Sequence, residues 1–322
     1  MFLHLHKLHI ALQSEDVLIQ QQWQQLLAGW IGADETADLT LQLQLTNELP
    51  PLPAGEPFFT DSHHLPDNVG ILSAYKQAGG VLLHYLDGGL VEVPLTAVSH
   101  PCASGVVLPS VMAYGRFEDV TFTSLAPLLR RRGYYLVHAF AACKGGRCVL
   151  IVGPSGSGKT TTGLGLLLAG WQLLSNDMVL LEERRDGVYA LPTPGGVSIR
   201  QQSLTLLPGL QAIIGDTPWV NGKYELMGQQ LVNGRWPEAA RITAVYFPQI
   251  EEREETAVSP HSPALCLAQL MEESMDRWDA ATFMDHMNIL QKISQQAAAY
   301  RLHLSPNLSQ LSAIIGPVDT LI

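Results

Sequence analysis

A glycine-rich segment in the middle of this 322-residue chain has the residue types and spacing of a phosphate-binding loop. Glycine adopts backbone angles that other residues resist, so successive N–H groups can turn towards one anion. The motif predicts that Lys159 reaches the β- and γ-phosphates of ATP and that the Thr160 hydroxyl binds Mg²⁺. Thr161 completes the candidate ATP-binding set, which matches G-x-x-x-x-G-K-[ST] at every position of its first eight residues: Gly153, Pro154, Ser155, Gly156, Ser157, Gly158, Lys159, Thr160 and Thr161.

An acidic residue follows the loop at a spacing that suits phosphoryl transfer. Asp177 lies 18 residues after Lys159, at the expected end of the next strand. An acid this early after the loop is typical of P-loop kinases, where it lies beside the transferred group. Asp177 is therefore a candidate for holding Mg²⁺ or for orienting an acceptor hydroxyl. The alternative is an aspartate that only caps a turn.

Other side chains could also reach a phosphate. His138 lies on the expected strand before the loop, and it is either a partner of the γ-phosphate or a satisfied core histidine. Arg200 and Lys223 are downstream cations with the same potential, although surface charge is the simpler explanation. Arg130–Arg132 end an expected helix, Ser124–Arg132, where they suit the helix dipole or a phosphate contact.

The elements that would position these residues alternate between strand and helix. This order predicts an α/β core with a nucleotide at the carboxyl end of the strand before the loop. Two further helices are expected near the end of the chain, at Pro263–Met271 and Thr282–Tyr300. The core elements predicted by apolar periodicity and turn residues are Tyr134–Cys143, Arg147–Val152, Lys159–Ala169, Trp171–Leu174, and Met178–Glu182 with Val188–Leu191.

Residues 1–120 have a different pattern, which predicts a β-rich region. Leu39–Leu45 alternates as a half-buried strand does, and Phe2–Leu12 alternates in part. Asp87, Gly88 and Gly89 indicate a hairpin between two apolar runs. We therefore expect two domains: 1–120, with a possible role in recognising the substrate by adding a peptide to a sheet edge, and 121–322, the catalytic domain.

Composition narrows the class of protein. Hydrophobic residues make up 47% and the formal net charge is −11, which favours a sizeable core and argues against nucleic acid and anionic membrane partners. The apolar stretches are too short to span a bilayer and the first residues lack the pattern of a signal peptide, so we expect a cytoplasmic protein. The four cysteines fit no zinc pattern, and Cys143 and Cys148 are expected to be buried thiols.

Together, His138, the loop and the stretch Gly170–Asp177 resemble the catalytic domain of the HPr kinase/phosphorylase family. The resemblance is strongest for its shorter, HPr-kinase-like members, including those found with peptide-modifying clusters, and it covers residues 125–200. It implies a P-loop kinase core related to HPr kinase and phosphoenolpyruvate carboxykinase, and a Ser/Thr hydroxyl of a protein or peptide as acceptor. It also implies that Lys159 and Thr160 bind MgATP, with His138 and Asp177 at the reacting phosphate.

The chain departs from the family at one informative position. The family has two adjacent aspartates, whereas this chain has Asn176 followed by Asp177. An amide can still hydrogen-bond an acceptor hydroxyl, so we expect an active kinase in which Asn176→Asp leaves the transfer rate equal or raises it. Two other hypotheses stay open: a small-molecule P-loop kinase, and a non-catalytic nucleotide-binding regulator, which Asn176 would suit.

Overall fold

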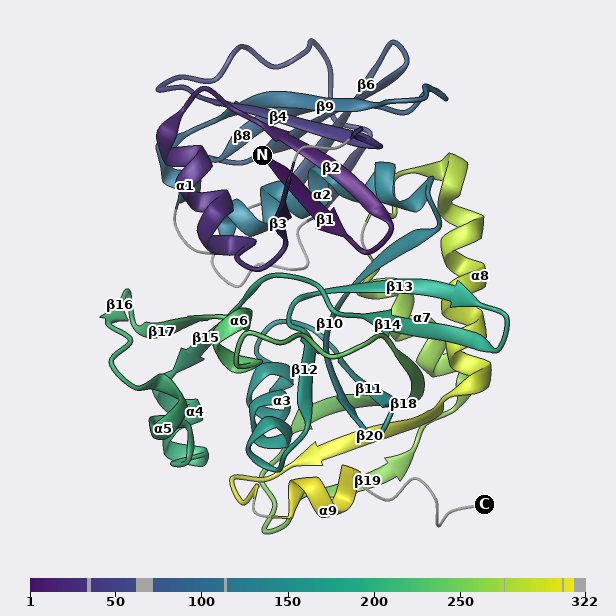
Figure 1. Cartoon of the computed structure of the whole chain (residues 1–322). Helices are drawn as coiled ribbons and strands as arrows, with labels where there is room; N and C mark the ends of the chain where they lie inside the picture. Colours follow the sequence, from purple (N-terminus) through teal and green to yellow (C-terminus); the bar gives the residue numbers. More distant parts are fainter. Residues whose placement is uncertain (34–35, 62–71, 113–114, 275, 309, 316–322) are drawn as a thin grey trace. The chain divides into compact units, whose positions relative to one another are not determined.

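The computed structural model describes residues 1–33, 36–61, 72–112, 115–274, 276–308 and 310–315 (Figure 1). The chain forms two compact units, and the later segment Asp276–Ala281 belongs to the first of them. The division falls after Arg132 rather than near residue 120, because helix α2 (Arg116–Arg130) is buried within the first unit. The first unit is Met1–Arg132 with Asp276–Ala281, and the second is Gly133–Met275 with Thr282–Ile322.

Among the described residues, the first unit contains a nine-stranded mixed sheet in the order β3-β1-β2-β4-β9-β8-β7-β6-β5. Leu39, Leu41 and Leu43 are fully buried on one face, as their alternation predicts. The expected single strand Phe2–Leu12 is instead a hairpin, because His6 adopts a positive φ of 59° and reverses the chain. The strands are β1 (Phe2–Leu5), β2 (Leu8–Gln13), β3 (Ile31–Gly32), β4 (Leu39–Leu45), β5 (Phe59–Asp61), β6 (Leu72–Gln77), β7 (Gly80–Tyr85), β8 (Gly89–Pro94) and β9 (Cys102–Val107).

Helices α1 (Val17–Leu26) and α2, with the short 3-10 helix η1 (Pro109–Met112), cover one face of this sheet (Figure 1). The indole N–H of Trp23 on α1 donates to the Thr121 hydroxyl on α2 over 3.2 Å. Helix α2 starts at Arg116, earlier than the expected Ser124. Buried polar residues in its first half, such as Thr121, interrupt the apolar pattern, so the sequence pattern understates its length.

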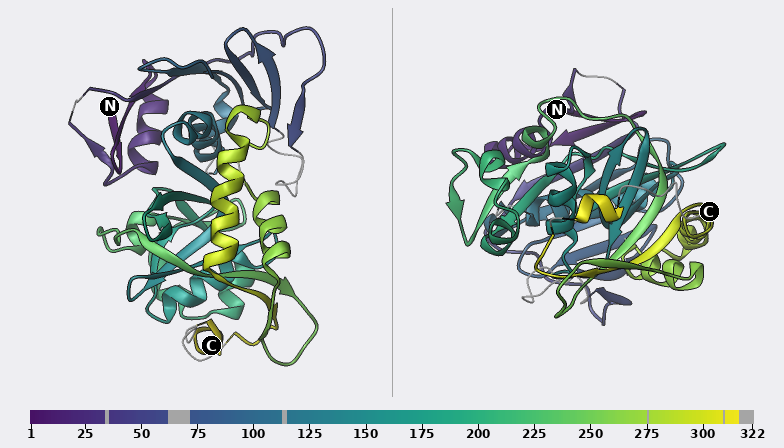
Figure 2. Two further views of the ribbon diagram at one scale, coloured as in Figure 1. Left: turned by 90° about the vertical axis from the view of Figure 1, so that its right-hand side faces the viewer. Right: turned by 90° about the horizontal axis from the view of Figure 1, so that it is seen from below.

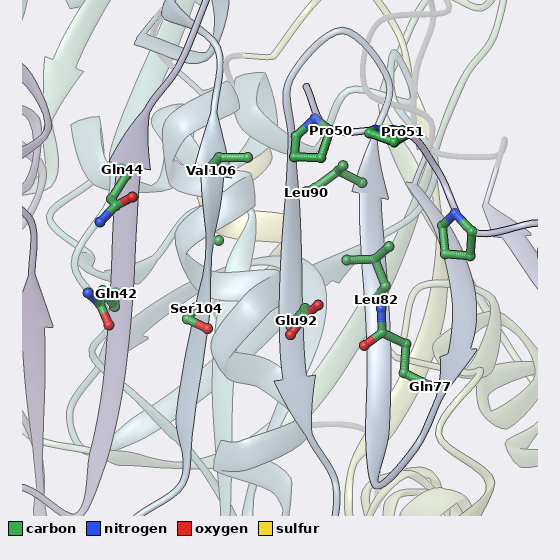
Figure 3. Close-up of a pocket in the computed structure, with 12 residues that line it drawn as sticks. Gln42, Gln44, Pro50, Pro51, Gln77, Leu82, Leu90, Glu92, Ser104 and Val106 are labelled. Atoms are coloured by element: carbon green, nitrogen blue, oxygen red, sulfur yellow. The ribbon is translucent and has the colours of Figure 1, made fainter. Parts of the chain in front are cut away.

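The opposite face of the same sheet is hollowed beneath the segment Pro50–Pro53 (Figure 3). The hollow has a volume of about 520 Å³. Its floor combines apolar side chains such as Leu82 and Leu90 with polar ones such as Gln42 and Glu92, which point outward from β4, β7 and β8. This sheet face therefore offers both hydrogen-bonding groups and apolar surface.

The three consecutive arginines at the end of α2 bind protein groups of the first unit. Arg130 lies 3.7 Å from a carboxylate oxygen of Asp276, and both side chains are 2% exposed. Arg131 contacts both carboxylate oxygens of Asp279, at 2.5 and 3.2 Å. Arg132 donates to backbone carbonyls. Arg130 and Arg131 thus attach the returning segment Asp276–Ala281 to the first unit.

Asp276 makes the stability of this attachment depend on pH. Burial raises the pKa of Asp276 to about 7, although Arg130 favours the charged form. Because this pKa lies above the value of about 4 in an unfolded chain, the stability that the neutral group confers is lost as the pH rises through 7. We expect the free energy of unfolding of Asp276→Asn, taken relative to that of the wild type, to rise by roughly 2–4 kcal/mol between pH 4 and pH 8.

Urea unfolding of the wild type and Asp276→Asn between pH 4 and pH 8 measures this difference. The change with pH should level off towards pH 4, where the unfolded wild-type chain also begins to bind the proton. A difference in free energy that stays constant over this range would show that Asp276 does not titrate as its burial implies.

The second unit is built on an eight-stranded sheet, in the order β11-β10-β13-β14-β18-β20-β19 among the described residues. Strand β12 pairs with β10, and β11 also pairs with β18 in parallel, so the pairings of five strands close on themselves. The predicted hairpin of β10 and β11 is confirmed, with Gly145 and Gly146 both at positive φ in its turn. The strands are β10 (Tyr134–Lys144), β11 (Arg147–Val152), β12 (Gln172–Ser175), β13 (Met178–Arg184), β14 (Gly187–Leu191), β18 (Ala240–Ile250), β19 (Ala257–Pro260) and β20 (Ala298–Leu304).

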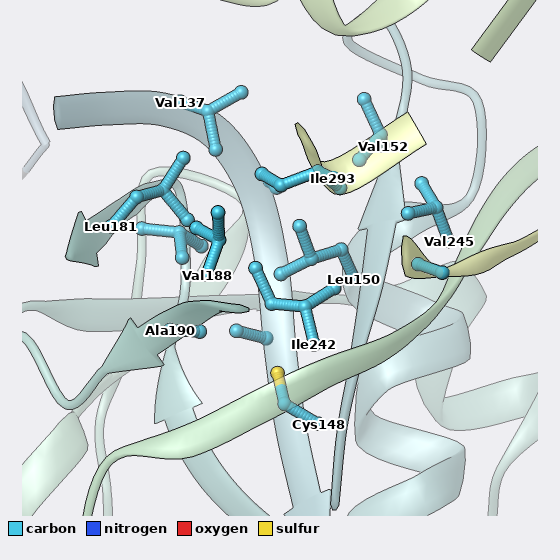
Figure 4. Close-up of a cluster of buried hydrophobic side chains, with 14 of the residues drawn as sticks. Val137, Cys148, Leu150, Val152, Leu181, Val188, Ala190, Ile242, Val245 and Ile293 are labelled. Carbon is cyan, nitrogen blue, oxygen red and sulfur yellow. The ribbon is translucent and has the colours of Figure 1, made fainter. Parts of the chain in front are cut away.

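Helices pack on both faces of this sheet. Helices α7 (Pro263–Glu272) and α8 (Ala280–Gln296) lie side by side on one face (Figure 2), over a core that includes Leu150, Ile242 and Ile293 (Figure 4). The other face packs on α3 (Lys159–Leu168) and on α9 (Leu311–Ile315). The remaining elements are α4 (Gln201–Leu206), α5 (Leu210–Ile214), α6 (Gly228–Leu231) and a small sheet of β15 (Gly196–Arg200), β17 (Lys223–Met227) and β16 (Trp219–Val220).

One prediction for this unit is wrong in part, and another is confirmed. The expected helix Thr282–Tyr300 ends at Gln296, and Ala298–Leu304 is strand β20, because it pairs in parallel with β18 and Tyr300 stacks on Tyr246. The expected buried thiols are confirmed: Cys143 and Cys148 face each other across the hairpin, free and buried. No helix in the described ranges is both long enough and apolar enough to cross a membrane.

Candidate active site

The glycine-rich loop connects the end of β11 to the start of α3. Gly156 and Gly158 have φ angles of 83° and 103°, which favour glycine, and a Cβ on Gly158 would lie 2.6 Å from the side chain of Leu304. Within the described part of the chain, the Ser157 and Thr162 hydroxyls are buried and have no hydrogen-bond partner. Ser157 lies between the two left-handed glycines, where an unpaired hydroxyl fits a phosphate group that accepts such a donor.

Lys159 lies across the loop. Its ammonium group donates to the carbonyl oxygens of Gly153 and Pro154, at 2.5 and 3.2 Å. Burial lowers the pKa of Lys159, and the nearby carboxylates of Glu273 and Asp177 oppose that effect. The ammonium group therefore has carbonyl partners that a phosphate could replace. Of the adjacent threonines, Thr160 is partly buried and Thr161 shares a hydrogen bond of 2.8 Å with Ser203 on α4.

The turn between β12 and β13 holds Asn176 and Asp177 in different environments. Asp177 has a positive φ of 65°, and its side chain is 50% exposed. Asn176 is buried, and its amide nitrogen donates to Asp177 at 2.9 Å and to the carbonyl oxygen of Gly196 at 2.8 Å. Asn176 is therefore turned into the protein, where it donates a hydrogen bond to Asp177.

His138 on β10 lies between two carboxylates. Its Nε2 is 3.6 Å from Asp177 Oδ1, and its Nδ1 is 2.7 Å from Glu273 Oε2. Burial lowers the pKa of His138, but hydrogen bonds to Asp177 and Glu273 outweigh this and raise it above its ordinary value. Burial likewise raises the pKa of Asp177, whereas His138 and Lys159 lower it overall, so the carboxylate is ionised at neutral pH.

The structure thus brings together three of the candidate residues, His138, Lys159 and Asp177, and adds Glu273. Glu273 is separated from His138 by 135 positions in the sequence, and no spacing rule connects them. The other two candidate cations have different surroundings. Lys223 pairs with Glu225 at 2.8 Å, and Arg200 is exposed at the end of β15.

The cluster can accept a proton or a cation at Asp177 and can donate from His138 and Lys159. No group of three or more His, Cys, Asp or Glu side chains within the described residues is arranged to hold a metal ion. Mg²⁺ in phosphate sites commonly uses only one or two protein oxygens together with substrate phosphates and water. Asp177 and Thr160 have the oxygen chemistry of such a set.

The hydrogen bonds of Asn176 change the expected effect of Asn176→Asp. Both neighbours of the amide nitrogen are acceptors, so the nitrogen must face them. A carboxylate there would have no proton to donate and would lie buried against a carbonyl and against Asp177. We expect Asn176→Asp to lower the free energy of unfolding by about 1–3 kcal/mol and to slow phosphoryl transfer, not to raise it.

Urea unfolding and single-turnover transfer from labelled ATP measure the two effects. Asn221→Asp is the matched control, because Asn221 is an exposed turn residue of the same unit. If Asn176→Asp transfers faster than the wild type, the amide does not hold Asp177 as the structure implies.

Comparison with known proteins finds only a distant structural similarity. No protein-family model matches the chain, and no curated protein matches it. Among solved structures, the Hpr(Ser) kinase/phosphatase from Coxiella burnetii is similar over 56% of this chain and 90% of its own, with 11% sequence identity and a TM-score of 0.27. At that TM-score the likeness does not bear on function.

Proposed function

We propose that this chain is an ATP-dependent kinase that transfers the γ-phosphate to a Ser/Thr hydroxyl of a protein or peptide. One observation carries the proposal: His138 lies 3.6 Å from Asp177, and both residues belong to the same compact unit as Lys159, whose ammonium group lies across the glycine-rich loop. An ionised carboxylate beside the loop lysine can position Mg²⁺ or the acceptor hydroxyl, and phosphoryl transfer needs a group in that role.

Each residue then has a chemical role. The loop donates backbone N–H groups to the phosphates, and Lys159 exchanges its carbonyl partners for phosphate oxygens. Thr160 and Asp177 would hold Mg²⁺, which neutralises charge on the phosphates when bound. Asp177 also accepts a hydrogen bond from the acceptor hydroxyl, and His138 orients Asp177 through Nε2.

The acceptor class follows from the sequence resemblance around the loop, and the first unit is the proposed recognition region. Its sheet supports this role with the hollow beneath Pro50–Pro53, where Gln42, Glu92 and Leu82 present polar and apolar groups on one face (Figure 3). A peptide could bind there through side chains and backbone amides, whereas a small-molecule kinase has no need of such a surface.

The test uses the full chain with γ-labelled ATP and Mg²⁺. The acceptors are a Ser- and Thr-containing peptide library and the same library with alanine at the acceptor position. We expect label in the first library and none in the second. Label only in small metabolites from a cell extract would favour a small-molecule kinase. ATP binding with neither transfer nor hydrolysis would show a non-catalytic regulator. Comparing phosphoproteomes with and without the gene then identifies the natural acceptor.

A further inference from the structure

The end of helix α7 is joined to strand β10 at His138 by backbone contacts. The carbonyl oxygen of Glu273 accepts a hydrogen bond of 2.8 Å from the backbone N–H of His138. The next residue, Ser274, forms an isolated antiparallel β-bridge with Val137. These contacts hold the backbone of Glu273 opposite His138, so the Glu273 carboxylate can reach the imidazole ring of His138.

The Glu273 side chain is 6% exposed, and its Oε2 lies 2.7 Å from His138 Nδ1. A buried carboxylate is unfavourable unless it is hydrogen-bonded. The hydrogen bond to His138 therefore offsets the cost of burying the Glu273 carboxylate. The exposed neighbour Glu272, one position earlier, has no such constraint.

A hydrogen bond from one ring nitrogen to a carboxylate fixes the orientation of the ring, and with it the direction in which the other ring nitrogen points. With Nδ1–H donating to Glu273, the ring cannot flip, and an Nε2–H can donate only towards Asp177. Nε2 is then directed at Asp177 Oδ1, 3.6 Å away. We propose that Glu273 is a positioning residue for phosphoryl transfer, which holds the His138 ring so that Nε2 faces Asp177. This inference rests on the proposed kinase function.

The role predicts a specific kinetic signature. Glu273 reaches the reacting groups through His138 and Asp177, so its loss should slow transfer and leave ATP affinity unchanged. Losing a partner that orients a site residue commonly costs 10–100-fold in activity. Glu273→Ala should therefore lower the single-turnover rate at least tenfold, with the dissociation constant for ATP within about twofold of the wild type. Glu273→Gln keeps an acceptor oxygen for Nδ1–H and should stay within about threefold.

The matched control is Glu272→Gln, which should leave both quantities unchanged. Equal losses in Glu273→Ala and Glu273→Gln, or a parallel loss of ATP affinity, would show that the charge of Glu273 acts on Lys159, and would overturn the positioning role. A wild-type transfer rate in Glu273→Ala would overturn it too.

A second measurement does not depend on catalysis. Nitrogen-15 NMR of the histidine rings, with His138→Gln to identify the signal, reports which ring nitrogen of His138 carries the hydrogen-bonded proton. We expect Glu273→Ala to shift the Nδ1 resonance and Glu273→Gln to restore most of it. An unshifted resonance would overturn the inference. If the wild type transfers phosphate to no acceptor, the kinase proposal fails, and the NMR result alone then decides whether Glu273 orients His138.

Discussion

Replacing Asp177 with asparagine should lower the rate of phosphoryl transfer by about 10²-fold or more. The variant keeps the size and turn geometry of the side chain, since asparagine also tolerates a positive φ. It removes the negative charge that His138 and Lys159 stabilise. Because the pKa of Asp177 lies below its ordinary value, the carboxylate is present throughout the neutral range, and the loss should be similar from pH 6 to pH 8.

The measurement is single-turnover transfer from labelled ATP to the peptide library. Asp216→Asn is the control, because Asp216 is an exposed aspartate of the same unit. Circular dichroism and the unfolding midpoint show whether the variant is folded. A folded Asp177→Asn protein that transfers at the wild-type rate would mean that Asp177 is structural and that the reacting phosphate lies elsewhere.

Replacing Lys159 should weaken the binding of MgATP at least tenfold, which corresponds to the loss of about 1.5–3 kcal/mol for a charge-assisted contact. The ammonium group already lies across the loop, so little rearrangement is needed before it meets a phosphate. Lys159→Ala removes it, and Lys159→Met removes the charge while keeping most of the buried stem. Both variants should lose affinity to a similar extent.

Isothermal titration with MgATP measures this loss. Lys292→Ala is the control, because Lys292 is exposed and pairs with Glu183 on the surface of the same unit. Wild-type affinity in Lys159→Met would mean that the glycine-rich loop does not bind ATP phosphates. If Lys159→Ala alone loses affinity, the cause is packing of the stem and not charge.

Together the two variants separate binding from chemistry. A kinase should lose ATP affinity with Lys159 and lose transfer with Asp177. A regulator that only binds nucleotide would respond to Lys159 and show no transfer that Asp177 could affect. The pair therefore tests the proposed function even before the natural acceptor is known.

Local sequence was enough to predict the features that depend on neighbouring residues. The loop Gly153–Thr160, the hairpin at Gly145 and Gly146, and strand β4 all depend on glycine angles or on alternation over a few positions. These preferences act through the backbone of the same segment, so they can be predicted from the amino-acid sequence. The placement of Asp177 directly after strand β12 is predictable for the same reason.

Tertiary structure alone decided the features that depend on distant partners. The sequence pattern predicts a helix up to Tyr300, but Ala298–Leu304 forms a strand because it hydrogen-bonds in parallel with β18. The orientation of Asn176 depends on the Gly196 carbonyl, and that of His138 depends on Glu273. Hydrogen bonds of this kind join segments that are far apart in the chain, and no periodic pattern in the sequence indicates which segments will meet. The folded core determines which of them meet, and so it decides which amide supports Asp177 and which carboxylate holds His138.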